Sequence, residues 1–465
     1  MQRRIFKLFG LGVALAVIAL AAGHSGQIGL AQGGKTITVC ASGCDFAKIQ
    51  AAIDSASAGD TIQVQDGTYA ENVTISSKQD LTLQGAGRDV VTLDGSAGVA
   101  DQKPAILIQD SQKITIKGFK IAKSRRAVHA IGSTGLVVAD NRFENNLRQS
   151  VLFDKSEGQL TGDLIQNTQL DQDGTRGEGV NIADSQVILK DNTISKNILF
   201  GIVAQGSSQV TVINNRITET KSDPQQNFFG VGINLLGSTQ VTIQGNTIAQ
   251  NDRRGILIQE NVQATIQQQN TIADNNKVGI MLGGSAKATI EDNTIIRNAE
   301  AGIELTDSAE ATITNNQINN NKFDAQNQFA LGVWLLKNSR ATIEKNTISQ
   351  NAARGIRLDD TAQAMIRQNM ILANNRVGVS LFGSAKATIE GNTITDSAIQ
   401  GITVGAPDIP NETIQVEISK NTIRRNGCGV FADNDPGIKI TGQGNDVGVL
   451  CGDTSKFPTG FGGGK

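Results

Sequence analysis

The sequence predicts an all-β solenoid, a parallel β-helix with three long sheets, from a repeated phrase, its period and its internal alternation. The phrase Val278–Ile295 returns almost unchanged as Val377–Ile394. Its most regular member is an asparagine that reappears every 23 to 31 residues, a period typical of solenoids. The repeated asparagines are Asn192, Asn215, Asn246, Asn270, Asn293, Asn316, Asn346, Asn369, Asn392 and Asn421.

The alternation inside one period predicts strands. Each repeat holds three short runs with apolar residues at alternate positions, such as Ile280–Leu282, Ala288–Ile290 and Thr294–Ile295, which indicates strands with one face inward. The turns are too short for a crossover helix, so each strand should stack on its equivalent in the next coil, about 4.8 Å away. The repeated asparagine should turn the corner between the second and third strands in a left-handed conformation. We interpret the resulting asparagine ladder as structural.

A longer period suggests that a block of four coils is duplicated. Residues Phe229–Leu236 align with Phe329–Leu336, an offset of 100 residues. Each copy carries an insertion, Glu219–Phe229 and Asn319–Phe329, in the turn between a third strand and the next first strand. Insertions of this kind often mark the binding face of a solenoid.

The two ends of the chain differ from the repeats. Residues 1–31 read as a secretory signal peptide, since the basic Met1–Lys7 precedes the apolar Leu8–Ala22 and small residues follow,. Cleavage after Ala22 and after Ala31 both fit. We expect an exported protein, secreted, periplasmic or at the cell surface, with no membrane span after processing. Residues 35–455 should form a single domain, and residues 456–465 a flexible Gly-rich tail.

Export makes disulfides the expected state of the four cysteines. Cys428 and Cys451 are 23 residues apart, about one coil, so they should stack within bridging distance. Cys40 and Cys44 can close a local loop. A zinc site is disfavoured by the spacing and by the single histidine left after processing. We predict the disulfides Cys40–Cys44 and Cys428–Cys451.

Residues 45–56 form the one convincing helix pattern, with Asp45 as its N-cap. An amphipathic helix here would close the open apolar end of the solenoid. Its apolar face would consist of Phe46, Ile49, Ile53 and Ala56.

The first coils also carry a family resemblance. Ile49–Asp54, Gly67–Val73 and Leu81–Gly87 look like the entrance of pectin-lyase-like right-handed β-helix proteins, which pectin methylesterases share. The later Asn-Thr-Ile coils resemble carbohydrate-associated β-helix repeats, including those of NosD-type periplasmic proteins. The resemblance covers essentially the whole mature chain and implies a right-handed parallel β-helix. It does not imply one activity, because many chemistries share this scaffold.

The working motifs of those relatives are absent. The chain lacks the Gly-Tyr-Gln-Asp and Asp-Phe-Ile-Phe-Gly motifs of the esterases and the Asp-Pro-His motif of mannuronan epimerases. Copper, which the NosD resemblance would suggest, needs more His, Met or Cys ligands than the chain offers. The calcium-binding nonapeptide of other β-helices is also missing. We therefore predict no metal and no cofactor.

The outward face of the first sheet is the expected working surface. We predict that Glu304, Trp334 and Arg357, on successive coils, and Asn234 bind substrate, since an exposed indole beside charged groups can stack on a sugar and hydrogen-bond to it. The open alternative is a set of structural salt bridges with a cation–π contact. The outward position of each first strand is Leu107, His129, Leu152, Asn181, Val203, Asn234, Leu257, Met281, Glu304, Trp334, Arg357, Ser380 and Thr403.

Two other features leave alternatives open. His129, with Arg125, Arg126 and Asp154 within a coil, is either a surface histidine or a base beside a cation. Columns of outward threonines on the second and third sheets suggest ice binding, although β-branched residues on a strand face explain them. One column is Thr211, Thr242, Thr265, Thr289, Thr312 and Thr342, and the other is Thr247, Thr271, Thr294, Thr347 and Thr393.

These observations favour an exported β-helix that binds polysaccharide through the outward face of its first sheet, without catalytic machinery. The alternatives are a divergent polysaccharide lyase, hydrolase or epimerase, and a structural or adhesive surface protein. The net charge is −2 with both signs interspersed, so no nucleic-acid partner is expected.

Overall fold

The computed structural model describes residues 34–225, 228–326 and 328–462. The predicted signal peptide, residues 1–31, lies outside the described residues. In the described part of the chain, no helix has the length and apolar character needed to cross a membrane.

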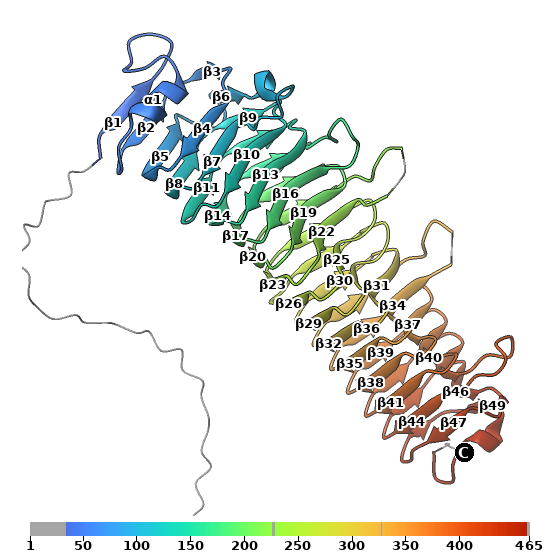
Figure 1. The fold of residues 1–465 in the computed structure, drawn as a ribbon. Coiled ribbons are helices and arrows are strands. Elements are labelled where there is room, and N and C mark those ends of the chain that lie inside the picture. Colours follow the sequence, from blue (N-terminus) through green and yellow to red (C-terminus); the bar gives the residue numbers. More distant parts are fainter. Residues whose placement is uncertain (1–33, 226–227, 327, 463–465) are drawn as a thin grey trace, which may run out of the picture. The chain divides into compact units, whose positions relative to one another are not determined.

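The described chain winds into coils that stack one on another, and each coil adds one strand to each of three parallel sheets (Figure 1). The first sheet contains β4 Val73–Ser76, β7 Ile106–Gln109, β10 Arg126–Ile131, β13 Arg148–Asp154, β16 Gly177–Ala183, β19 Phe200–Gln205, β22 Val231–Leu235, β25 Ile256–Ile258, β28 Ile280–Leu282, β31 Glu300–Leu305, β34 Ala330–Leu335, β37 Arg354–Leu358, β40 Val377–Leu381, β43 Gln400–Val404, β46 Cys428–Ala432 and β49 Leu450–Gly452. The second sheet contains β1 Thr36–Val39, β2 Thr61–Val64, β5 Gln79–Gly85, β8 Gln112–Lys117, β11 Leu136–Ala139, β14 Glu157–Thr161, β17 Gln186–Lys190, β20 Gln209–Ile213, β23 Gln240–Gln244, β26 Gln263–Gln267, β29 Lys287–Glu291, β32 Glu310–Thr314, β35 Arg340–Glu344, β38 Gln363–Arg367, β41 Lys386–Glu390, β44 Gln415–Ser419 and β47 Lys439–Thr441. The third sheet contains β3 Gly67–Tyr69, β6 Val91–Asp94, β9 Lys120–Ala122, β12 Arg142–Glu144, β15 Leu164–Gln166, β18 Thr193–Ser195, β21 Arg216–Thr218, β24 Thr247–Ala249, β27 Thr271–Ala273, β30 Thr294–Ile296, β33 Gln317–Asn319, β36 Thr347–Ser349, β39 Met370–Leu372, β42 Thr393–Thr395, β45 Thr422–Arg424 and β48 Asp446–Val447. The predicted fold class is therefore confirmed.

The core is a stack of aliphatic side chains enclosed by the sheets. In one coil Ile280, Ile290 and Ile295 point inward from the three sheets and are fully buried. The same positions are filled by valine, leucine or isoleucine in the neighbouring coils, and they form one continuous apolar cluster. Each coil therefore buries its apolar face against its neighbours, as the repeat period indicates.

The repeated asparagines form the expected ladder at the corner between the second and third sheets. The side-chain amide of Asn293 donates to Asn316 Oδ1 at 3.1 Å, and the main-chain N–H of Asn293 donates to the same oxygen at 3.0 Å. A second ladder, which the sequence analysis missed, runs along the corner after the third sheet, where Asn251 Nδ2 donates to Asn275 Oδ1 at 2.8 Å.

The predicted left-handed conformation belongs to the residue before each ladder asparagine. Asp292 before Asn293 has φ 54° and Asn315 before Asn316 has φ 55°. The ladder asparagine itself turns its side chain inward and is buried. The prediction was wrong by one position, because the ladder hydrogen bonds and the left-handed turn are made by two adjacent residues.

The helix α1 covers the apolar end of the first coils but is shorter than predicted. It spans Ile49–Ser55, and Lys48 rather than Asp45 is its N-cap residue. The Glu71 carboxylate accepts hydrogen bonds from the main-chain N–H groups of Ile49 and Gln50, at 3.0 and 3.2 Å. A carboxylate from the next turn of the chain therefore replaces the local cap.

The other end of the solenoid is also covered. Part of the predicted flexible tail packs against the last coil, where Phe461 is 2% exposed and its ring lies 5.0 Å from that of Phe457. The carbonyl of Phe461 accepts a hydrogen bond from Asn445 Nδ2 at 3.1 Å, which ends the asparagine ladder. The tail prediction is wrong for this segment, because its composition conceals two aromatic anchors. Two 3-10 helices, η1 Ser96–Gly98 and η2 Thr454–Lys456, complete the elements.

Three of the insertions between the third and first sheets are closed in the same way. They are residues 167–176, 219–230 and 320–329, and the first was not predicted. In each, the main-chain N–H of a buried aspartate donates to the carbonyl five residues later, in the pairs Asp171 to Arg176, Asp223 to Phe228 and Asp324 to Phe329. The latter two insertions end in phenylalanines that pack on the outward face of the first sheet.

Candidate functional site

The outward column of the first sheet has the predicted register. Met281, Glu304, Trp334 and Arg357 lie opposite one another on β28, β31, β34 and β37. Glu304, Trp334 and Arg357 are thus brought together. Asn234, on β22, is separated from Glu304 by Leu257 and Met281, so the four predicted residues do not surround one point.

Trp334 faces outward but is not open to a ligand. Its side chain is 8% exposed, and the Phe329 ring from the insertion lies 4.6 Å from its own. The indole N–H donates to Asp359 Oδ2 at 2.6 Å. Arg357 lies over the indole ring at 5.8 Å and binds the same carboxylate through Nε and Nη2, at 2.7 and 2.8 Å. The expectation of an exposed indole is wrong, because the insertion packs over it.

Glu304 is the most perturbed carboxyl on this face. It is 9% exposed, and burial raises its pKa to about 7, with a further contribution from the Glu300 carboxylate. Arg254 and Lys277 act in the opposite direction. A carboxyl that is half ionised near neutral pH is a common property of catalytic acids and bases, and also of carboxyls that are merely buried.

A second outward column on the first sheet was missed. It lies three residues before the predicted one, and the register pairs Leu331 with Arg354 and Arg354 with Val377. Val278, Ala301 and Leu331 from this column pack with Trp334 in an apolar cluster. The recurrent residue that precedes each first-strand glycine would have revealed it.

His129 lies half-buried beside the guanidinium of Arg126, at the N-terminal side of this face. Burial and the neighbouring Arg126 lower the pKa of His129 to about 4, so it is neutral at neutral pH, and its Nε2 has no hydrogen-bond partner among the described residues. Arg126 Nε donates to Gln149 Oε1 at 2.8 Å. The predicted neighbour Asp154 is opposite Ile131 rather than His129.

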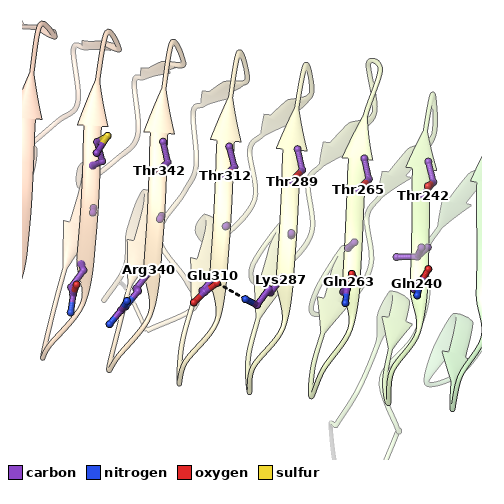
Figure 2. Close-up of a pocket in the computed structure, with 18 of the residues that line it drawn as sticks. Gln240, Thr242, Gln263, Thr265, Lys287, Thr289, Glu310, Thr312, Arg340 and Thr342 are labelled. Carbon is purple, nitrogen blue, oxygen red and sulfur yellow. Dashed lines mark ion pairs between the residues drawn. The ribbon is translucent and has the colours of Figure 1, made fainter. Parts of the chain in front are cut away.

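The second sheet carries an open groove on its outward face. It is a groove of about 1400 Å³ that crosses eleven strands, from β17 to β47. Ten strand spacings correspond to a length of about 48 Å. Figure 2 shows two parallel rows of side chains, threonines such as Thr289 and Thr312 in one row and longer polar residues such as Lys287 and Glu310 in the other. Small residues, mainly alanine and valine, lie between the rows.

The polar row of the groove contains amides and charges. It consists of Gln186, Gln209, Gln240, Gln263, Lys287, Glu310, Arg340, Gln363, Lys386, Gln415 and Lys439. Lys287 and Glu310 form an ion pair at 2.8 Å, which Figure 2 marks. This hydrogen bond lowers the pKa of Glu310, so the Glu310 carboxylate is ionised at neutral pH. The groove has no buried titratable group, which suits binding better than acid–base chemistry.

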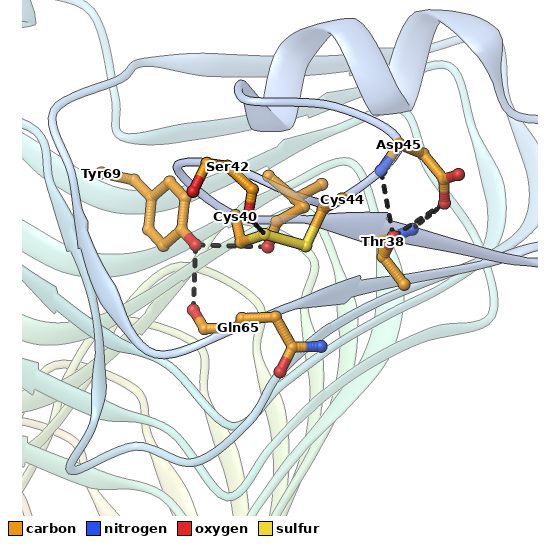
Figure 3. Close-up of a disulfide and its surroundings, with 8 residues drawn as sticks. Thr38, Cys40, Ser42, Cys44, Asp45, Gln65 and Tyr69 are labelled. Atoms are coloured by element: carbon orange, nitrogen blue, oxygen red, sulfur yellow. Dashed lines mark hydrogen bonds between the residues drawn. A yellow bond between two sulfur atoms is a disulfide. The ribbon is translucent and has the colours of Figure 1, made fainter.

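Both predicted disulfides are present. Cys40 and Cys44 close a short loop beside Tyr69, whose hydroxyl donates to Gln65 O at 3.0 Å (Figure 3). Cys428 and Cys451 have a Cα–Cα distance of 6.4 Å. They are not stacked equivalents, since Cys451 pairs in register with Phe431; the disulfide instead joins the start of β46 to the middle of β49. No group of three or more potential metal ligands converges within the described residues.

The coil architecture defines a parallel β-helix protein. Residues 159–270 and 261–408 match the family model of the right handed beta helix region. The match covers more than half of the chain, so the chain belongs to this right-handed β-helix family. No curated protein sequence matches the chain.

Solved structures of similar proteins include three polysaccharide-acting enzymes. An alginate lyase from Paenibacillus sp. str. FPU-7 is 15% identical, with a TM-score of 0.44, over 56% of this chain and 94% of its own. A double mutant of the periplasmic alginate epimerase AlgG is 14% identical, with a TM-score of 0.45, over 78% and 84%. The catalytic unit of a GH87 alpha-1,3-glucanase from Streptomyces thermodiastaticus strain HF3-3 is 15% identical, with a TM-score of 0.40, over 89% and 68%.

Proposed function

We propose that the protein binds an extended polysaccharide along the groove of the second sheet. The observation that carries this proposal is the groove itself, which is open and is lined at every coil by a hydroxyl-bearing or amide-bearing side chain. Sugars offer a donor and an acceptor at each hydroxyl, and threonine and glutamine can meet both. A polymer with a regular repeat can therefore make similar contacts on many successive coils.

Other ligands fit this surface less well. A peptide that adds a strand needs a free sheet edge, whereas the groove lies on a sheet face whose strands are paired on both sides. Ice binding would require a flat and uniform threonine array, and Met365 and Glu417 interrupt the threonine row beside a row that carries charges. The few apolar side chains in the groove do not favour a protein partner.

This proposal moves the binding surface from the first sheet to the second. The polar groups of Trp334, Arg357 and Asp359 already bind one another: the indole N–H and the Arg357 guanidinium both donate to the Asp359 carboxylate. We therefore assign this set to holding the residues 320–329 insertion against the first sheet. Asn234 has an Oδ1 without a hydrogen-bond partner among the described residues, but only 5% of the residue is exposed.

We also propose that the protein works outside the cytoplasm. The two disulfides support this location, because such bonds persist in oxidising compartments. Detection of the processed protein in the exported fraction, with residues 1–31 removed, is the expected result.

The decisive experiment is affinity electrophoresis of the purified protein in gels that contain different polysaccharides. Replacing Thr289 and Thr342 together by tryptophan should fill the groove and abolish the retardation. The matched control makes the same replacement at Thr294 and Thr347, which lie on the same coils but on the third sheet. This control should bind like the unmodified protein. Equal binding by both variants would remove the groove from the proposal, provided that both unfold at the same temperature as the parent.

A second candidate function is a divergent polysaccharide lyase, hydrolase or epimerase that uses Glu304. The carboxyl with a pKa of about 7 beside Arg254 favours it, since a base and a charge-neutralising cation are the minimum for such chemistry. Product analysis by mass spectrometry should then detect turnover that Glu304→Gln abolishes; no product with any polysaccharide that the groove retains would exclude this candidate.

A further inference from the structure

The polar row of the groove changes character halfway along the solenoid. From β17 to β26 the row contains only glutamines, whereas from β29 to β47 cations occupy every second strand. The register is continuous over this part, with the order Lys287, Glu310, Arg340, Gln363, Lys386, Gln415 and Lys439. Positive charges are therefore separated by two strand spacings, about 9.6 Å.

Three of these cations are available to a ligand. Lys287 is engaged by Glu310 at 2.8 Å. Arg340, Lys386 and Lys439 are exposed, and none has an ion pair within 4.0 Å among the described residues. Two carboxylates also face this half of the groove: Glu310, which is paired, and Glu417 in the threonine row. The free charge in the polar row is therefore positive and spaced at alternate coils.

An extended chain of pyranose rings advances by roughly one strand spacing per ring. Every second ring would then stand opposite a cation, with a glutamine opposite the ring between. An exposed cation in a shallow groove attracts a carboxylate or sulfate but is easily screened by salt. A neutral hydroxyl suffices opposite the glutamine.

We infer that the ligand of the C-terminal half of the groove is an acidic polysaccharide with an anionic group on alternate sugars. This inference rests on the proposed binding function and adds the charge pattern of the ligand to it. Single-stranded nucleic acid fits less well, because it carries a phosphate on every nucleotide and the net charge of the protein is −2,.

The test compares polymers of matched length by titration calorimetry at low ionic strength. Hyaluronan has one carboxylate on every second sugar, polygalacturonate has one on every sugar, dextran has none, and a single-stranded oligonucleotide represents nucleic acid. Hyaluronan should bind most tightly and should lose affinity at high ionic strength. Equal or tighter binding of polygalacturonate or of the oligonucleotide would overturn the inferred spacing.

Variants connect the charge pattern to named residues. Arg340→Gln, Lys386→Gln and Lys439→Gln should each weaken hyaluronan binding roughly two- to fivefold, and the triple variant should lose the salt dependence. Arg216→Gln removes an exposed guanidinium from the third sheet that has no ion pair with any described residue; it is the control and should have no effect. If dextran and hyaluronan bind equally and the triple variant is unchanged, this inference fails while the proposed function stands; if no polysaccharide binds, the proposed function itself fails.

Discussion

Asp163→Asn should stabilise the protein, and the gain should grow as the pH rises. Asp163 takes a rung of the first asparagine ladder and is 2% exposed. Its Oδ1 accepts hydrogen bonds from the main-chain N–H and from Nδ2 of Asn141, at 2.7 and 3.1 Å, whereas its Oδ2 has no partner. In the neighbouring rung that place is taken by an amide nitrogen, and Asn192 Nδ2 donates to Leu160 O at 2.8 Å.

The size of the stability gain follows from the Asp163 Oδ2, which has no hydrogen-bond partner among the described residues. Burial raises the pKa of Asp163 well above its usual value of 3.8, so the native state holds its proton more tightly than the unfolded state. This contribution to stability is fully present below about pH 3.8 and is lost as the pH rises through the raised native pKa, by about 1.4 kcal/mol per pH unit. Asparagine satisfies the rung at every pH, so it should gain about 1–3 kcal/mol at neutral pH, the cost of one unsatisfied buried polar group.

Urea unfolding of both proteins between pH 4 and pH 8 measures this difference. The two midpoints should nearly coincide in acid and separate progressively toward pH 8. The converse variant Asn192→Asp places a carboxyl in the next rung and should acquire the pH dependence that Asp163→Asn loses. A constant offset across the range, or a less stable Asp163→Asn at pH 8, would refute the assignment of Asp163 as a neutral member of the ladder.

Three further predictions concern other parts of the fold. Burial raises the pKa of Glu304 to about 7, so the Glu304→Gln variant should be as stable as the parent below about pH 4.5. Above pH 7 the variant should be more stable, by roughly 3 kcal/mol at most. Thermal unfolding at several pH values measures this difference. Cys428→Ser should lower the unfolding free energy by about 3 kcal/mol, as expected for a loop of this length, and hydrogen exchange should accelerate first in β46 and β49; unchanged exchange there would contradict a stapling role. Trp334→Ala should cost about 3–5 kcal/mol yet leave polysaccharide retardation unchanged, and the fluorescence of this sole tryptophan should not respond to ligand; a strong response would return the binding site to the first sheet.

Periodicity in the sequence predicts the relations that the backbone imposes. Once the period is known, stacking assigns each residue a neighbour one coil away, which is why Glu304, Trp334 and Arg357 were correctly placed side by side. The same reasoning marked the threonine column of the second sheet, of which Thr289 is a member. Such relations need no knowledge of side-chain packing.

Periodicity does not predict what covers a face. The accessibility of Trp334 depends on Phe329, which belongs to an insertion outside the repeat. The tail likewise packs through Phe457 and Phe461, two aromatic residues in a segment whose composition is otherwise typical of a linker. The groove depends on how the two side-chain rows rise above the small residues between them, a property of the folded surface rather than of any one strand.

The duplicated block of 100 residues has an evolutionary consequence. A block of whole coils can be copied into the middle of this chain without leaving an unpaired strand or a broken ladder, because each copied coil presents the same edges as the coil it displaces. Growth of this kind leaves both covered termini untouched. The span of the solenoid is therefore a quantity that genetic change can adjust in steps of one turn, independently of the residues that close its ends.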